Sequence, residues 1–308
     1  MRSNCRKKTC PSCQQKTLVV KDGFFFRRCD SRKIQRYRCK ICSKKFSSAT
    51  FSPAKNQKKR RFNHTLLLQL ASGISQNRAA ILHKCHPITI KRKFEYLAKR
   101  SRIKNKKLLQ SLYQDQRCTE VQFDDLITIE HTKLKPLSVT VIVDKKTRRV
   151  LGTNIATIGA FGHLAKISLN KYGKRINNHI PKMHELFKSV ESYIHPLAII
   201  ESDEHKFYPQ IVKTHFPGAT HISFPGGKSS IAGQGELKKL KFDPLFCINH
   251  TNAMLRANIN RLFRRTWNTT KRIEQLQKHL DIYCYALIRV WFGKCKKNKS
   301  WKIIIEIK

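Results

Sequence analysis

The pattern of apolar and polar positions changes along the chain, and from residue 119 onward it is typical of an α/β domain. Short apolar runs with turn signals between them predict strands, and apolar residues at helical spacing predict helices. The expected strands are at 120–130, 138–144, 150–158, 196–200 and 220–223, and the expected helices are at 180–194, 206–215, 251–265 and 270–291. We therefore expect one α/β domain over residues 119–295.

Residues 63–110 predict three consecutive helices. The first begins near Leu66, and Ser75 is placed to cap a second helix over 76–84. A third helix, with many cations, is expected from Thr89 to about residue 102. The short turn and the basic third helix match a helix-turn-helix, although a plain helical hairpin in a linker would give a similar pattern. The candidate DNA contacts of the third helix are Lys91, Arg92 and Lys93.

Residues 1–50 contain two cysteine pairs with the spacing of a zinc site. Two residues lie between the members of each pair, and 25 residues separate the pairs. A two-residue gap lets both sulfurs of a pair reach one tetrahedral ion, so the segment predicts a zinc ribbon with structural Zn²⁺. The expected ligands are Cys10, Cys13, Cys39 and Cys42, while Cys5 and Cys29 are expected to be free thiols.

The chain is strongly basic. Its 308 residues include 64 Lys+Arg against 19 Asp+Glu, a formal net charge of +45. This charge is too large for an ordinary cytosolic enzyme and indicates a polyanionic partner, with nucleic acid as the usual one. The alternative is a lysine-rich solvated surface, which self-repulsion disfavours. Residues 1–110, with a basic linker at 51–62, hold 31 of the cations and only 3 of the acids.

The N-terminus is basic, but no apolar segment follows it, so no signal peptide is expected. No run of about 18 apolar residues occurs, so no membrane span is expected either. Eleven cysteines in a chain without an export signal indicate metal ligands and reduced thiols rather than disulfides. We therefore expect a cytoplasmic protein.

The acidic residues suggest a second metal site. Three strands, a helix and a strand ending in an aspartate follow the order of a ribonuclease H-like core, a mixed five-stranded sheet with flanking helices. In such a core, acids from the first and fourth strands hold metal ions. Asp124 and Asp125 are the first-strand candidates, and they point to opposite faces. Asp124 shares the more polar face with Gln122 and Glu130, so it is the expected ligand beside Asp203, and oxygen ligands suit Mg²⁺ or Mn²⁺.

The residues alone leave the third ligand open. Glu236 lies in a glycine-rich segment, and Asn249 offers an amide oxygen that coordinates Mg²⁺ more weakly than a carboxylate does. The helix after Asn249 carries Asn and Arg at every fourth position, a stripe that suits phosphate contacts but also suits a plain solvated face. The candidate DNA-binding cations of this region are Arg256, Arg261, Arg264 and Arg265.

Several short segments, in their order along the chain, resemble those of a known family. They are Gln35–Cys42, Phe123–Leu126, Thr147–Gly152, Ser202–Asp203 with Tyr208, Asn252–Arg256, Arg261–Thr266 and Thr270–Lys271. The combination resembles bacterial insertion-sequence transposases of the DDE type, nearest to the insertion-sequence-one group and its relatives. The likeness spans nearly the whole chain, and its specificity comes from the order of the motifs.

The resemblance implies metal-dependent cleavage and strand transfer of DNA at the ends of an insertion sequence. It places the metal-binding aspartates on Asp124 and Asp203, and it puts Asn249 where the family has glutamate. Either Glu236 supplies the acid, or Asn249 replaces it, or this copy is catalytically impaired; we favour Glu236. The zinc ribbon and helix-turn-helix would recognise terminal inverted repeats, and a homo-oligomer would assemble on DNA beside the bacterial nucleoid. Residues 296–308 are expected to form a basic tail.

Two other functions fit the same modules. One is a DNA-binding regulator without catalysis, which would bind specific sequences and cleave none. The other is a ribonuclease H-like nuclease, which would need no sequence-reading arm, so that cleavage would survive deletion of residues 1–110.

Overall fold

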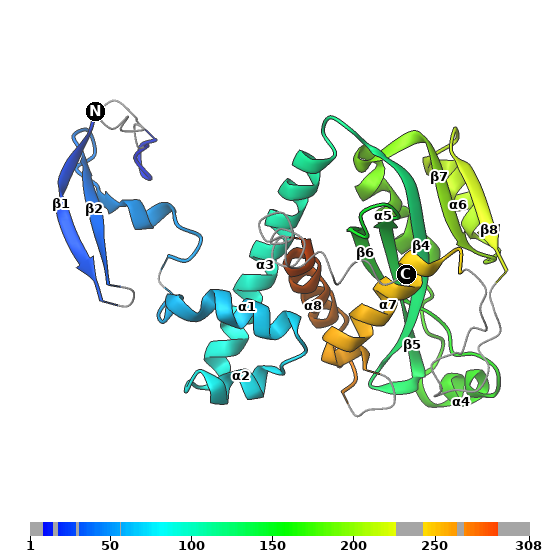
Figure 1. Ribbon diagram of the computed structural model, residues 1–308. Helices are drawn as coiled ribbons and strands as arrows, with labels where there is room; N and C mark the ends of the chain where they lie inside the picture. The colour runs from blue at the N-terminus through cyan, green and yellow to red at the C-terminus, as the bar shows by residue number, and fades with distance from the viewer. Residues whose placement is uncertain are drawn as a thin grey trace, which may run out of the picture. The chain divides into compact units, whose positions relative to one another are not determined.

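The computed structural model describes residues 9–14, 18–28, 31–55, 57–225, 243–263 and 268–288. The chain forms two compact units, Met1–Leu66 and Leu67–Lys308 (Figure 1). The boundary falls inside the first long helix, α1 (Asn63–Ala71).

The N-terminal unit is built on a small antiparallel sheet. Its strands β1 (Val19–Arg27), β2 (Arg32–Cys39) and β3 (Lys45–Ser47) lie in the order β1-β2-β3. Two short 3-10 helices, η1 (Ser48–Phe51) and η2 (Arg60–Phe62), follow. The apolar interior is small, with the rings of Tyr37 and Phe46 stacked 5.6 Å apart beside buried Cys10 and Cys39. So small a core stabilises the unit little by itself.

Three helices open the second unit, as the apolar spacing predicts. After α1 come α2 (Gln76–Leu82) and α3 (Pro87–Leu112). The Ser75 hydroxyl accepts a hydrogen bond from the Arg78 amide at 3.3 Å, which caps α2. Helix α3 begins at Pro87, where a missing amide proton costs nothing, and runs about ten residues beyond the expected end. Its C-terminal part is held by tertiary packing, with Leu109 buried in the main core.

A mixed five-stranded sheet forms the centre of the second unit, which confirms the expected α/β class. Its strands are β4 (Cys118–Glu130), β5 (Thr132–Asp144), β6 (Val150–Thr157), β7 (Ile194–Asp203) and β8 (Thr220–Phe224). The strand order is β6-β5-β4-β7-β8. Strands β4, β5 and β6 pair antiparallel, and β7 is parallel to both β4 and β8.

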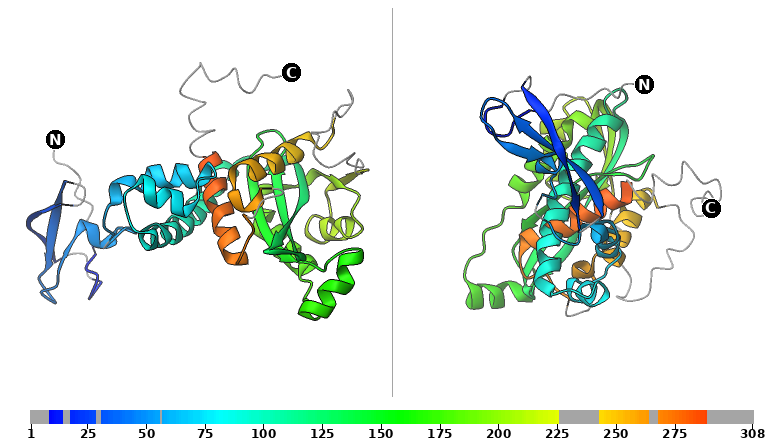
Figure 2. Two further views of the ribbon diagram at one scale, coloured as in Figure 1. Left: turned by 90° about the horizontal axis from the view of Figure 1, so that it is seen from below. Right: turned by 90° about the vertical axis from the view of Figure 1, so that its left-hand side faces the viewer.

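Helices flank this sheet on both faces. They are α4 (His163–Tyr172), α5 (His179–Val190), α6 (Tyr208–His215), α7 (Phe246–Asn258) and α8 (Ile273–Ala286), with the 3-10 helices η3 (Glu191–Tyr193) and η4 (Asn260–Leu262). Phe123 of β4 contacts Phe187 of α5 and Tyr208 of α6 on one face. Its neighbour Gln122 contacts α7 on the other. Helix α8 packs along α3, and α4 lies beside the start of β5 (Figure 2).

Helix α5 approaches the edge strand β6 so closely that only glycine fits at one position. A Cβ atom on Gly152 would lie 2.7 Å from Leu186 Cδ1 and 2.9 Å from Val190 Cγ1, both of α5. These distances are shorter than real Cβ contacts, so a side chain there would displace the side chains of Leu186 and Val190 or the helix that carries them.

Gly152→Ala is therefore expected to lower the free energy of unfolding by about 1–3 kcal/mol, the usual cost of overpacking. Gly159→Ala is the matched control, because a Cβ there meets nothing within 4 Å. Denaturant titration of both variants measures the difference. Equal stability of the two variants would contradict the close approach of α5.

Candidate functional site

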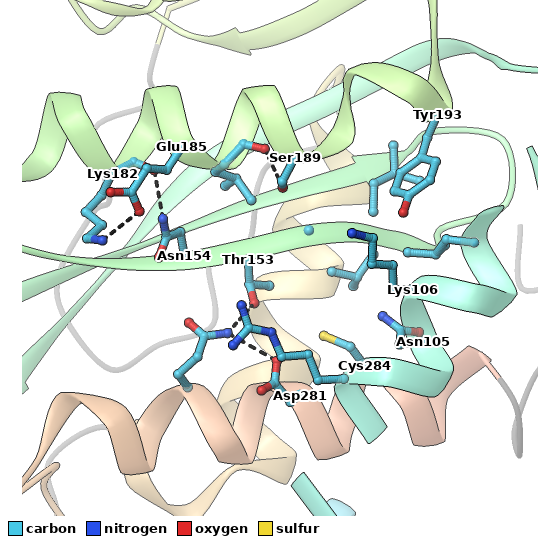
Figure 3. Close-up of a pocket in the computed structure, with 17 residues that line it drawn as sticks. Asn105, Lys106, Thr153, Asn154, Lys182, Glu185, Ser189, Tyr193, Asp281 and Cys284 are labelled. Atoms are coloured by element: carbon cyan, nitrogen blue, oxygen red, sulfur yellow. Dashed lines mark hydrogen bonds and ion pairs between the residues drawn. The ribbon is translucent and has the colours of Figure 1, made fainter. Parts of the chain in front are cut away.

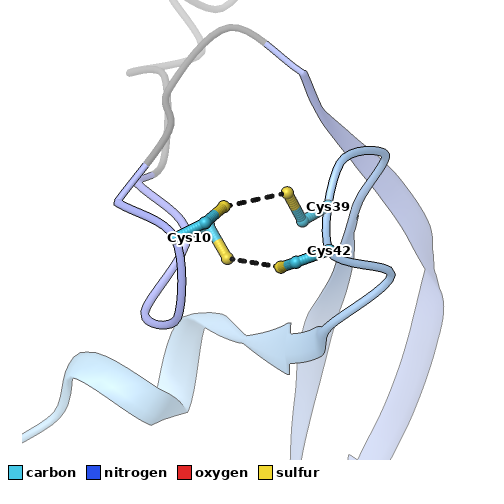
Figure 4. Close-up of side chains that lie close together, drawn as sticks. Cys10, Cys39 and Cys42 are labelled. Atoms are coloured by element: carbon cyan, nitrogen blue, oxygen red, sulfur yellow. Dashed lines mark hydrogen bonds between the residues drawn. The ribbon is translucent and has the colours of Figure 1, made fainter.

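The cysteine pairs of the N-terminal unit converge on one point (Figure 4). Cys10 and Cys13 come from a tight turn, whereas Cys39 ends β2 and Cys42 follows in the next turn. The four sulfur atoms all lie within 4.8 Å of one another, with 3.6 Å between Cys10 and Cys42 and 3.5 Å between Cys13 and Cys39. Sulfurs at about 2.3 Å from a tetrahedral zinc are of this separation. The group can hold a structural zinc and fits a zinc ribbon.

Hydrogen bonds from backbone amides lower the pKa values of two of these thiols. Burial raises the pKa of the Cys10 thiol, but hydrogen bonds from the Cys13 and Ser12 amides, with help from Cys42, outweigh it and bring it to about 7. The amide of Cys42 likewise lowers the pKa of Cys39. Because the thiolate is the metal ligand, these turns favour binding near neutral pH.

The second candidate site lies on the main sheet, where β4 and β7 run parallel. Gln122 pairs with Glu201 in this register. Two residues further along each strand, Asp124 and Asp203 follow on the same face, at the end of β7. Neighbouring strands lie about 4.8 Å apart, so the parallel register brings the two carboxylates together. Ligand sites of α/β sheets are common at such strand ends.

Burial and mutual repulsion disfavour two charges here. Burial, and after it the charge of Asp203, raises the pKa of Asp124 to about 7. Burial also raises the pKa of Asp203, although the nearby His205 offsets part of this rise. Carboxylates with raised pKa values at a strand end are typical of sites that bind a cation or a proton.

Asn252 of α7 completes the polar group around Asp124. Its Nδ2 donates a hydrogen bond to Asp124 Oδ2 at 2.9 Å. Its Oδ1 is buried and accepts no hydrogen bond within the described part of the chain, and the same holds for Oδ1 of Asp203. Buried oxygen atoms without a donor are costly. A hard divalent cation would satisfy both, so the residues present fit Mg²⁺ or Mn²⁺.

A network of polar side chains joins the start of α7 to the sheet. Gln122 Oε1 accepts a hydrogen bond from the Ile248 amide at 3.0 Å, and its Nε2 donates to Pro244 O at 2.7 Å and to Glu201 Oε2 at 2.6 Å. Lys145 pairs with the other oxygen of Glu201 at 2.6 Å. Glu201 therefore serves as an anchor for the helix that carries Asn252.

Asp125 belongs to the opposite face, as strand alternation predicts. Its carboxylate accepts hydrogen bonds from Thr140, His179 and Tyr208. Burial alone would raise the pKa of Asp125, but the hydrogen bond and charge of His179 hold it below its ordinary value. Asp125 is thus satisfied by three protein donors and ties β4 to β5, α5 and α6.

Of the two third-ligand candidates from the sequence, the structure describes only Asn249. Asn249 is exposed, and its Nδ2 donates to Asp243 Oδ2 at 2.9 Å. Glu236 lies outside the described residues. The contact with Asp124 is instead made by Asn252, one helical turn after Asn249. The sequence predicts that Asn252 belongs to the polar stripe of this helix but does not assign it a role at the acids. Asn252 lies three residues after Asn249, and this helical spacing could have indicated that it faces the same side.

An open cleft of about 730 Å³ reaches Asp124, with Asn249, Asn252 and Arg256 also among its lining residues; Asp203 is not among them. Arg256 also donates to Ile127 O at 3.4 Å. Arg261, by contrast, donates a hydrogen bond to Thr269 O at 2.9 Å. Arg264 and Arg265 lie outside the described residues.

The cations of α3 divide between surface and interior. Lys91 and Arg92 are exposed, but Lys93 is only 4% exposed. Lys93 is three residues after Ile90 and one before Phe94, so helical spacing places it on the buried face. The expectation of a surface contact at Lys93 therefore needs correction, because its side chain is not presented to solvent.

A separate cavity of about 480 Å³ lies at the edge of β6, between α3, α5 and α8 (Figure 3). Cations and anions both line it, including Arg102, Lys106, Glu185 and Asp281. Burial raises the pKa of Asp281 to about 6. The mixed charges do not define one ligand chemistry.

Within the described part of the chain, no helix combines the length and apolar character needed to cross a bilayer. No protein-family model matches this chain, and no curated protein matches it at a significant level.

Replacing Cys39 with serine is expected to abolish binding of zinc by the purified chain, because three thiolates and a hydroxyl form a much weaker site. Cys85→Ser is the control, since Cys85 lies outside the cluster. Elemental analysis of both proteins measures zinc per chain. Retention of zinc by the Cys39→Ser protein at the level of the control would exclude the four-cysteine site.

Asp124→Asn is expected to change how stability depends on pH when no divalent metal is added. The raised pKa of Asp124 means that the folded state keeps a proton from about pH 4 to about pH 7 that the unfolded chain has lost. Stability from this group is therefore present at low pH and lost as the pH rises through this range.

The variant, which has no such proton to lose, should gain stability relative to the parent protein as the pH rises from about 4 to 7. Unfolding titrations at several pH values measure this difference. Asp115→Asn is the control, because Asp115 is exposed. A difference that stays flat with pH for Asp124→Asn, as for the control, would contradict the buried acidic pair.

Proposed function

We propose that this protein is a metal-dependent DNA transposase of the DDE type. The single observation that carries the proposal is the position of Asp124 and Asp203 on the neighbouring parallel strands β4 and β7, with Asn252 of α7 hydrogen-bonded to Asp124. The strand order β6-β5-β4-β7-β8, with three antiparallel strands followed by two parallel ones, supports a ribonuclease H-like core. In that arrangement the first and fourth strands are neighbours, which is where these acids lie.

The proposed metal site takes its ligands from all three elements. Asp124 and Asp203 would supply carboxylate oxygens, and Asn252, with its buried Oδ1, is the third ligand that the contacts favour. Bound Mg²⁺ or Mn²⁺ would lower the pKa of a water nucleophile and offset the negative charge that develops on the scissile phosphate.

The protein's own groups would bind and orient the DNA. Arg256 lies in the cleft beside the acids, where its guanidinium suits the phosphate next to the scissile bond. Lys91 and Arg92, exposed on α3, suit contacts of a helix-turn-helix with the duplex. The zinc-binding unit would add further contacts at the terminal repeats. Because two DNA ends must be joined, we expect a homo-oligomer on DNA.

The account predicts that Asp203→Asn removes cleavage of duplex DNA carrying the element's own ends in the presence of Mg²⁺. Loss of one ligand of a catalytic metal should lower the rate by at least about a hundredfold, since residues that act as a unit lose most of their effect together. Affinity for the DNA should stay within about twofold, because the cations are unchanged.

Glu204→Gln is the matched control, an adjacent carboxylate that is exposed to solvent. A gel assay of nicked and strand-transferred products measures cleavage, and a filter-binding assay measures affinity. Equal product from the Asp203→Asn and control proteins would refute the assignment.

One observation favours a second candidate, a DNA-binding regulator without catalysis. Among the described residues, the side chain that donates a hydrogen bond to Asp124 is an amide, that of Asn252, and the amide of Asn249 donates to Asp243. An amide contributes no charge to a metal site. Sequence-specific binding by the parent protein with no cleavage in Mg²⁺ or Mn²⁺ would decide for this candidate.

A further inference from the structure

The N-terminal unit contains a concave site whose lining is dominated by arginine. A cavity of about 630 Å³ lies between the end of the β1–β2 hairpin and the segment that follows η1. Five arginines line it, together with two serines and an alanine. The arginines are Arg27, Arg28 and Arg32 from the hairpin and Arg60 and Arg61 from the segment at η2.

The two sides of the cavity are held by local hydrogen bonds. Arg27 and Arg32 face each other across the last pair of the β1–β2 ladder. On the other side, the Ser52 hydroxyl accepts from the Ala54 amide at 3.3 Å, and Arg60 Nε donates to Gln57 O at 3.0 Å. Arginines separated by about thirty positions in the chain are thus brought to one concavity by the fold itself.

All the charged side chains among the described residues that line this cavity are positive. None of the described residues that line it is acidic, and Asp22, on the same strand as Arg27, is not among them. Guanidinium groups around one space repel one another, and a bound anion would offset this repulsion. Guanidinium groups present paired N–H donors that match phosphate oxygens.

The surroundings favour a phosphate that belongs to nucleic acid over a free anion. Phe24 and Phe26, on the strand that leads to the cavity, are 51% and 65% exposed. The Lys33 ammonium lies 4.6 Å from the centre of the Phe24 ring. Exposed aromatic rings interleaved with cations are typical of surfaces that contact the sugars and bases next to a phosphate.

We propose that this arginine-lined cavity binds the phosphodiester backbone of DNA, as a contact separate from the helix-turn-helix and from the acidic site. The proposal rests on the proposed function only in taking DNA as the partner, and it holds equally for a regulator that does not cleave. Its role is to anchor the zinc-binding unit on the backbone, independent of base sequence.

The test compares two double variants of the full-length, zinc-loaded chain. Arg32→Ala with Arg61→Ala removes one cation from each side of the cavity. Lys21→Ala with Lys55→Ala is the matched control, since it removes one exposed cation from the same hairpin and one from the same linker, outside the cavity. Zinc content verifies that each variant keeps its fold.

The dissociation constant for a duplex is measured as a function of salt concentration, without added Mg²⁺, so that cleavage plays no part. Each lost phosphate contact lowers the slope of log K against log salt by about 0.9. The cavity variant is expected to lose about one to two units of slope and to bind roughly tenfold more weakly at low salt. The control is expected to change little, and Arg32→Lys with Arg61→Lys should retain most of the slope.

Three results would overturn the proposal. The slope of the cavity variant could equal that of the parent protein, or both double variants could lose slope equally, which would reduce the effect to overall charge. The third result would come from calorimetry with inorganic phosphate. If the parent protein binds phosphate and the cavity variant does not, while both proteins have the same salt dependence of DNA binding, the cavity binds a free anion. None of these results depends on whether Asp203 supports cleavage.

Discussion

The parallel pairing of β4 with β7 places two carboxylates side by side in a partly buried position, and much of the second unit serves to hold them there. Burial raises the cost of ionising both Asp124 and Asp203, and the charge of Asp203 adds to that cost at Asp124. Neighbouring polar groups reduce that cost only in part: Asn252 donates one hydrogen bond to Asp124, and His205 lowers the pKa of Asp203. Such a pair is stable when protonated or when it shares a cation, and near neutral pH the cation is the alternative that keeps both acids ionised.

The rest of the core is arranged around this pair. On one face of the sheet, Asp125 is fully engaged with Thr140, His179 and Tyr208, so the strand β4 is fixed at the residue next to Asp124. On the other face, Gln122 joins the sheet to the start of α7, which sets the position of Asn252. Replacing any of these supporting residues would shift Asp124 or Asn252 although neither residue is itself changed. Residues behind a metal site commonly affect it in this way, and the same would hold for the proposed site.

The N-terminal unit depends on a different constraint. Its apolar core is small, and zinc in comparable small domains contributes on the order of 10–16 kcal/mol at neutral pH. The ion would therefore supply most of the stability of this unit. Under the proposed function, the soft thiolates of the first unit and the hard carboxylate and amide oxygens of the second would therefore bind different metal ions.

Local features were predictable from the sequence, and contacts between distant segments were not. The cysteine spacing, the Ser75 cap, the succession of strands along the chain and the opposite faces of Asp124 and Asp125 follow from rules that span a few residues. The length of α3 depends on packing against α8, which the local pattern does not contain. The hydrogen bond between Asp124 and Asn252 joins residues 128 positions apart. For Lys93 the local pattern was sufficient, because helical spacing places this residue on the buried face of α3. Its charge nevertheless suggested a role at the surface.

Binding of Mn²⁺, followed by electron paramagnetic resonance, tests the central claim most directly. The account predicts that the zinc-loaded parent protein binds Mn²⁺ at a site that is lost in Asp124→Asn and weakened in Asn252→Leu, while Asp125 and the fold stay intact. Equal binding of Mn²⁺ by the parent protein and both variants, or no binding by any of them, would contradict a shared cation at the junction of β4, β7 and α7.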